Sequence, residues 1–75
     1  MNKTTIGLNA GIVWRLLSTD NRRWEYRELK EATGLSDRDL NTAIGWLARE
    51  DKIQFDNNDM EKKEHLYIEL NLYIG

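Results

Sequence analysis

The sequence predicts an α+β fold in which three helices, the first two separated by a short strand, precede a two-stranded hairpin. Two patterns lead to this prediction: apolar residues recur at helical spacing in the first part of the chain, and they alternate with polar residues near its end. The chain has 75 residues, of which 40% are hydrophobic, and it contains neither cysteine nor proline. We therefore expect residues 1–75 to form one domain that is stabilised by an apolar core, without disulfides.

The first helix is expected over residues 5–18, with Thr5 or Asn9 as its N-cap. Residues 18–21 have the composition of a turn and should end it. The apolar residues of this segment follow the spacing of one helix face, which we expect to lie in the core. They are Leu8, Ile12, Val13, Leu16 and Leu17.

A short strand around Trp24 and two further helices are expected next. The second helix covers residues 27–33, and Gly34 should end it in the left-handed conformation. The third covers residues 37–50 and is the best marked, because Ser36 can cap it and acidic residues follow at the positive end of its dipole. Its core-facing residues are Leu40, Ala43, Ile44 and Leu47.

The hairpin is indicated by a change of period from 3.6 to 2 after residue 52. A first strand is expected over residues 52–56, a turn over residues 56–59, and a longer strand from His65 onward. The element order is therefore helix, strand, helix, helix, strand, strand, which is that of a winged helix-turn-helix domain.

Two segments resemble a particular family of this fold. The segments are Ile6-Gly7-Leu8-Asn9-Ala10-Gly11-Ile12-Val13-Trp14 and Gly45-Trp46-Leu47-Ala48-Arg49-Glu50-Asp51-Lys52-Ile53. They are similar to a family of small stand-alone winged helix-turn-helix domains of bacteria and archaea that has no established biochemical function. The resemblance implies the winged-helix fold and a role in transcription.

The outer face of the third helix is the first candidate site. Arginine and asparagine make paired hydrogen bonds to guanine and adenine edges, threonine can contact a thymine methyl, and glycine permits close approach. The alternative is an ordinary solvated helix face. The residues on this face are Arg38, Asn41, Thr42, Gly45 and Arg49.

The charges favour DNA only locally. Eleven Lys and Arg stand against thirteen Asp and Glu, whereas a small DNA-binding domain is usually basic. Arg22 and Arg23, near Arg27 and Lys30, are a basic concentration that can hold phosphate, meet an acidic partner or form a solvated loop. Acidic residues occupy the start of the third helix and the hairpin, where Lys62 and Lys63 are the basic residues. These acids are Asp37, Asp39, Asp56, Asp59, Glu61 and Glu64.

The tryptophans suggest core positions and an interface. We expect Trp14 and Trp24 in the core, and Trp46 either beneath the hairpin near Phe55 or in an interface, where tryptophan is enriched.

The last strand suggests contact with a second copy of the chain. Its alternation extends beyond its expected hairpin partner, and an exposed apolar strand must be covered. A twofold dimer through this strand is one solution, with Lys3 to Ile6 covering part of the edge; a wing strand folded back on the first helix is the other. The dimer contacts would be Leu70, Asn71, Leu72, Tyr73 and Ile74.

Two functions remain after catalysis is set aside. His65 is the only histidine, cysteine is absent and no glycine-rich phosphate loop occurs, so we expect no enzyme, metal or cofactor. No segment has the apolar length of a membrane span or the pattern of a signal peptide, so we expect a cytoplasmic protein. The first function is a transcription-related DNA-binding protein that uses the third helix; the alternative is a protein-interaction or dimerisation module.

Overall fold

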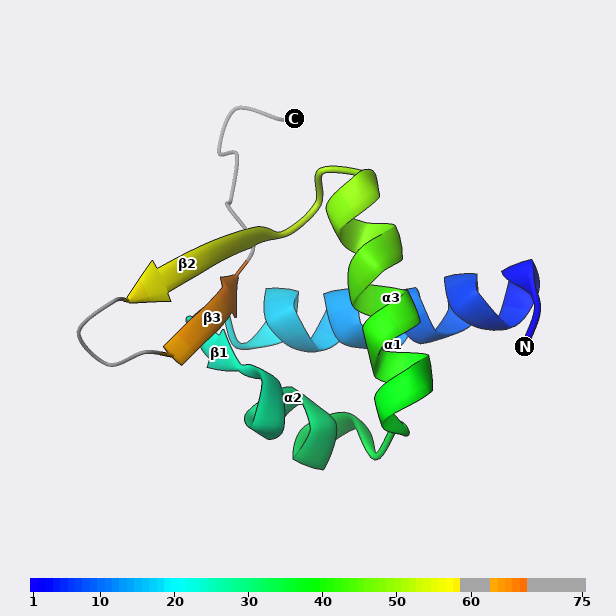
Figure 1. Ribbon diagram of the computed structural model, residues 1–75, viewed down its shortest axis with the longest axis horizontal. Helices are drawn as coiled ribbons and strands as arrows, with labels where there is room; N and C mark the ends of the chain where they lie inside the picture. Colours follow the sequence, from blue (N-terminus) through cyan, green and yellow to red (C-terminus); the bar gives the residue numbers. More distant parts are fainter. Residues whose placement is uncertain (59–62, 68–75) are drawn as a thin grey trace.

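The computed structural model describes residues 1–58 and 63–67, and it confirms the predicted α+β winged helix. Figure 1 shows α3 crossing in front of α1, with α2 and the sheet to one side. The elements are α1 (Lys3–Thr19), β1 (Trp24–Glu25), α2 (Tyr26–Thr33), α3 (Asp37–Arg49), β2 (Gln54–Asn58) and β3 (Lys63–Tyr67).

The sheet has three antiparallel strands in the order β1-β3-β2. Leu66 of β3 lies opposite Trp24 on one side and Phe55 on the other. The turn predicted over residues 56–59 is wrong for residues 56–58, which belong to β2 and pair with residues 63–65. Backbone pairing with β3 outweighs the turn propensity of the Asp-Asn-Asn sequence.

The start of α1 differs from the prediction. Asn2 is the N-cap, and its Oδ1 accepts a hydrogen bond of 2.8 Å from the backbone N–H of Thr5. Thr5 and Asn9 both lie inside the helix, so neither caps it. Residues 3–6 are helical, and the prediction that they cover a strand edge is therefore wrong.

The turn between α2 and α3 agrees with the prediction. Gly34 adopts a φ of 72°, the left-handed conformation that a side chain would disfavour. Ser36 caps α3, its hydroxyl accepting a hydrogen bond of 3.2 Å from the backbone N–H of Asp39. At the start of α2, Glu25 and Glu28 form a capping box, each side chain accepting from the other's backbone N–H.

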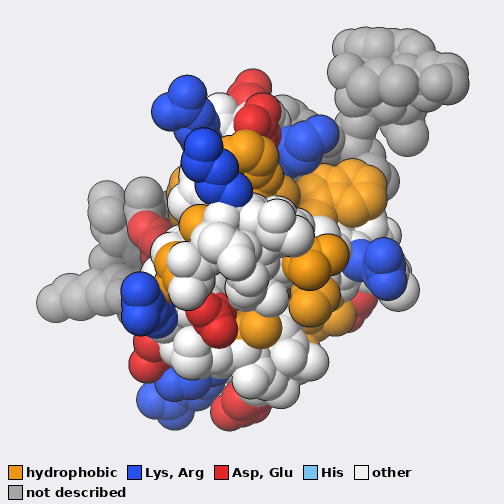
Figure 2. Space-filling view, turned by 90° about the vertical axis from the view of Figure 1, so that its right-hand side faces the viewer, with side chains coloured by type: hydrophobic (Ala, Val, Ile, Leu, Met, Phe, Trp, Pro, Cys, Tyr) orange, Lys and Arg blue, Asp and Glu red, His pale blue; other side chains and the backbone are white. Residues whose placement is uncertain are grey.

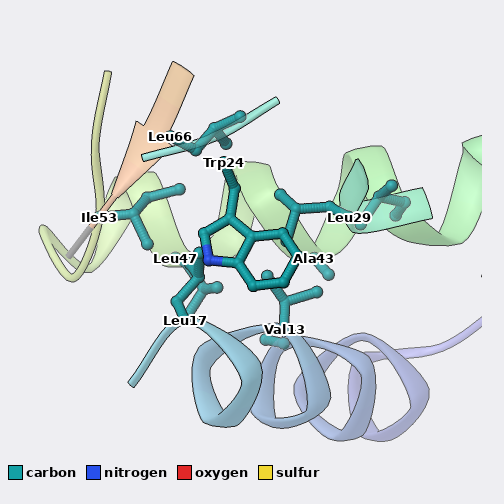
Figure 3. Close-up of a cluster of buried hydrophobic side chains, with 10 residues drawn as sticks. Val13, Leu17, Trp24, Leu29, Ala43, Leu47, Ile53 and Leu66 are labelled. Carbon is teal, nitrogen blue, oxygen red and sulfur yellow. The ribbon is translucent and has the colours of Figure 1, made fainter. Parts of the chain in front are cut away.

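Trp24 lies at the centre of the core, surrounded by side chains from the helices and the sheet (Figure 3). Its indole Nε1 donates a hydrogen bond of 2.9 Å to the backbone carbonyl of Asp20, which satisfies its polar atom. The prediction that Trp24 is buried is confirmed. The buried hydrophobic residues are Ala10, Val13, Leu17, Trp24, Leu29, Leu40, Ala43, Leu47, Ile53 and Leu66.

Only part of the predicted apolar face of α1 is buried. Val13 and Leu17 are fully buried, whereas Leu8 and Ile12 are 66% and 46% exposed. Trp14 is also exposed, at 41%, so the prediction that it lies in the core is wrong. The reason is that α1 packs against α3 along one side only, and these three residues project outside that contact.

Candidate functional site

The outer face of α3 presents the predicted candidate residues together, on the side opposite the buried Leu40, Ala43 and Leu47. Arg38, Asn41, Gly45 and Arg49 are exposed, and Thr42 is half-buried. The face exists because α3 is amphipathic, with apolar residues every three to four positions and polar residues between them.

The side chains on this face differ in how they are engaged. Neither Arg38 nor Arg49 forms an ion pair with any residue that the structure describes. The Thr42 hydroxyl donates to the carbonyl oxygens of Arg38 and Asp39, at 3.1 and 3.0 Å, so its methyl group and oxygen lone pairs remain for a partner. Around Gly45 no atom outside the adjacent backbone of α3 lies within 4 Å of the position that a Cβ would take, so a partner can approach the helix there.

The acidic residues at the start of α3 are less unfavourable for DNA than the sequence suggests. The Tyr26 hydroxyl donates a hydrogen bond of 2.7 Å to Oδ1 of Asp37, and Lys30 Nζ lies 3.0 Å from Oδ2. The Tyr26 hydroxyl first, and Lys30 second, hold the pKa of Asp37 below its usual value. Because Lys30 balances its charge, Asp37 repels an approaching phosphate less. Asp39 has no ion pair among the described residues.

Arg22 is engaged within the molecule. Its guanidinium contacts Asp20 at 3.0 Å and Glu28 at 3.2 Å, and it stacks 3.8 Å from the centroid of the Trp24 ring. The Glu25 backbone N–H, followed by Arg22, lowers the pKa of Glu28. Arg22 therefore fastens the loop before β1 to the start of α2.

Arg23 is engaged with the hairpin. Its Nε lies 2.9 Å from Oδ2 of Asp56 in β2, and its guanidinium lies 4.0 Å from the centroid of the Tyr67 ring in β3. Asp56, which the sequence suggested would repel DNA, is thus paired. Lys63 is the first residue of β3 and lies opposite Asn58. Lys62 and the predicted dimer residues 70–74 lie outside the described part of the chain.

The surface is mixed in charge and carries exposed aromatic residues. In Figure 2 the basic and acidic side chains are interspersed, with hydrophobic side chains at the surface between them. Trp46, next to Gly45 on α3, is 45% exposed, and Phe55 is 42% exposed. Trp46 is therefore not buried beneath the hairpin, and the interface alternative stays a prediction.

Sequence reasoning missed the roles of Tyr26 and Lys30. Both lie on α2, whereas their partner Asp37 begins α3, so no spacing within one helix predicts the contact. The turn at Gly34 and the cap at Ser36 were the available signals, since they predict that the start of α3 lies close to α2.

The fold and the exposed third helix define a winged helix-turn-helix domain. The chain belongs to the winged helix-turn-helix domain family DUF2582, which it matches over residues 1–70. It is also similar to the solution NMR structure of protein BT2368 from Bacteroides thetaiotaomicron, with 31% identity and a TM-score of 0.81. That match covers 100% of this chain and 88% of the other. No curated protein sequence matches the chain. Among the described residues, no helix combines the length and apolar character needed to cross a membrane.

Proposed function

We propose that the domain binds double-stranded DNA by placing the outer face of α3 in the major groove. The supporting observation is that Arg38 and Arg49 extend from this face without ion-pair partners in the described parts of the chain. They are about 16 Å apart along the helix, at about 1.5 Å per residue. The major groove is about 12 Å wide, so their guanidinium groups can reach the groove and the phosphates at its borders.

The residues between the two arginines supply contacts to the bases. Asn41 can pair with an adenine edge, and the methyl group of Thr42 can contact a thymine methyl. Gly45 allows the helix backbone to come close to the groove, since the position that a Cβ would occupy there is open. Lys30 and Tyr26 hold the Asp37 carboxylate by both oxygens.

The test is binding to fluorescently labelled duplex DNA of mixed sequence at about 50 mM salt and tens of micromolar protein. Affinity should fall steeply as salt is raised, because phosphate contacts release counterions. Arg38→Ala and Arg49→Ala should each weaken binding and reduce the salt dependence by about one counterion. Lys3→Ala, which removes one charge from α1, is the matched control and should leave binding nearly unchanged. Absence of binding under these conditions contradicts the proposal.

A role in transcription extends the same proposal. In this role the domain would occupy DNA sites near promoters through α3. Crosslinking of the protein to DNA in cells, followed by sequencing, should show enrichment at promoter regions that Arg38→Ala abolishes. Uniform recovery of the genome would restrict the function to sequence-independent binding.

The second candidate function is a protein-interaction module on the winged-helix scaffold. The net charge of −2 and the exposed Trp46 and Phe55 support it, since aromatic residues are enriched in interfaces. A dimer through residues 70–74 belongs to this candidate. A chain that ends at residue 69 tests it: loss of self-association with retained helical circular dichroism supports this interface, and unchanged self-association contradicts it.

A further inference from the structure

The outer face of α1 is apolar and exposed. Leu8 and Ile12 are 66% and 46% exposed, and Leu16, one turn further on, is only partly buried. Lys3 and Arg15 are the only charged residues of the helix. An apolar helix face is normally buried against another element. Of the elements that the structure describes, α3 and, less extensively, α2 pack against α1, and they leave the face with Leu8 and Ile12 exposed.

A cavity lies beside this face, between α1 and α2. Its volume is about 300 Å³, and Ala32 of α2 forms part of its wall opposite Ile12 and Leu16 of α1. It is therefore an apolar depression with one cationic residue at its edge. The lining residues are Ile12, Arg15, Leu16, Thr19, Ala32 and Thr33.

The projecting Leu8 and the cavity are related to each other through Ile12. Leu8 precedes Ile12 by about one helical turn, and the middle of the cavity lies about one turn after Ile12. Leu8 and the cavity are therefore each about 6 Å from Ile12 along the helix axis, in opposite directions. A twofold axis through Ile12 and perpendicular to α1 exchanges these two positions. In an antiparallel pair of α1 helices, Leu8 of each copy would therefore enter the cavity of the other.

We propose that the outer face of α1 binds a second copy of this chain, with the two α1 helices antiparallel and Ile12 at the twofold axis. The spacing of Leu8, Ile12 and Leu16 forms the ridge that packs in the commonest class of helix pair, at about −50°. A twofold interface must be complementary to itself, and the Leu8 ridge and the cavity meet that condition.

The charges and the available area are consistent with a weak dimer. A residue at a twofold axis meets its own copy, so a charge there repels itself. Ile12, at the axis, is neutral, and Arg15 lies off the axis at the cavity edge. A stable interface buries about 800 Å² on each partner, about a seventh of this chain's 5615 Å² surface. One helix face, about 25 Å long and 10 Å wide, supplies only part of this area. The edge of α2 must add to it, and we expect a micromolar dissociation constant.

This arrangement leaves α3 free in both copies. Because α1 packs on α3 with its buried side, its outer face lies on the opposite side of the molecule from the outer face of α3 (Figure 1). The twofold axis then directs the two α3 faces away from each other. Such a dimer presents one α3 face on each side and does not place both in one DNA duplex. The dimer itself does not depend on DNA binding.

The experiment is sedimentation equilibrium over about 1–500 µM, with Ile12→Glu as the test variant. Two glutamates facing each other at the axis should raise the dissociation constant at least about 100-fold. Phe55→Glu is the matched control, because Phe55 is exposed to a similar extent but lies on β2. Circular dichroism verifies that each variant is folded. The proposal expects a dimer for the unmodified chain and for Phe55→Glu, and a monomer for Ile12→Glu.

A mixture of Ile12→Glu and Ile12→Lys chains gives a second, independent readout. Opposite charges at the axis should restore association in the mixture, whereas each variant alone stays monomeric. A monomer of the unmodified chain up to 500 µM, or a dimer that Ile12→Glu leaves unchanged, overturns the proposal. Dissociation by Leu72→Glu together with an intact Ile12→Glu dimer overturns it in favour of the terminal strand.

Discussion

The Tyr26 hydroxyl donates a hydrogen bond of 2.7 Å to the Asp37 carboxylate, which joins the first residue of α2 to the first residue of α3. Lys30 holds the other carboxylate oxygen at 3.0 Å. Side-chain contacts between α2 and α3, in addition to the turn itself, therefore fix the relative position of the two helices. The same contacts balance the charge of an acidic residue at the start of α3.

Replacing Tyr26 with phenylalanine tests this link. Burial first, and the hydrogen bond to Asp37 second, raise the pKa of Tyr26 above its usual 10.0, so the hydroxyl remains protonated at neutral pH. In Tyr26→Phe the ring stays and the donor is lost, so the pKa of Asp37 should rise toward its ordinary value of 3.8. An NMR pH titration of the Asp37 carboxyl measures this change. An unchanged pKa would mean that the hydrogen bond does not persist in solution.

Acid should weaken the fold through Glu28 and Asp37. Both have a lower pKa in the folded chain than their ordinary values of 4.5 and 3.8, so the unfolded chain binds more protons in this range. The two carboxylates contribute their full stabilisation of the folded state when the pH is above the ordinary pKa values. This contribution is lost as the pH falls through the lowered pKa values of the folded chain. Urea unfolding between pH 7 and pH 2.5 should show this loss. Glu28→Gln keeps an acceptor for the Glu25 N–H but removes the titrating group, so its stability should fall less steeply with decreasing pH. An equally steep fall in this variant would contradict the role given to Glu28.

The sequence was sufficient for the helix-turn-helix because its signals are local. Gly34, Ser36 and the spacing of Leu40 and Leu47 each act within a few residues, and the structure confirms all of them. Leu8 and Ile12 show the opposite case. Their spacing identifies an apolar stripe, but α1 is apolar on most sides, and only the position of α3 decides which arc is covered.

The candidate residues on α3 lie on the exposed face that the sequence predicts, but the charges around them are paired differently from what it suggests. The exposure of Arg38 and Arg49 follows from helical periodicity, so the sequence could predict it. The ion pairs Arg23–Asp56 and Lys30–Asp37 join different elements, and pairing across elements has no spacing rule. A count of charges along the chain therefore overstates both the free basic residues near Arg22 and the free acids of the hairpin.

Alanine at the two glycines near the site should have opposite effects on stability. Gly34→Ala should destabilise the fold by about 1–2 kcal/mol, because a residue with a Cβ is disfavoured at a left-handed φ. The added Cβ would meet no neighbouring atom, so this loss would come from the backbone conformation and not from a clash. Gly45→Ala should stabilise the fold by up to about 1 kcal/mol, because Gly45 lies inside α3. Urea midpoints measure both. Weaker DNA binding by the more stable Gly45→Ala protein would show that the backbone at Gly45 approaches the DNA, and unchanged binding would exclude that contact.

Two tryptophans that are ten residues apart should differ strongly in their contribution to stability. Trp24 is 5% exposed at the centre of the core, so Trp24→Ala should cost about 3–5 kcal/mol, a large part of the total for a domain of this size. Trp14 is 41% exposed, and Trp14→Ala should cost less than about 1 kcal/mol. Urea unfolding followed by circular dichroism at low protein concentration compares the two without relying on tryptophan emission. Equal losses for both variants would mean that α1 is covered on the Trp14 side as well, and the packing of α1 described above would then be wrong.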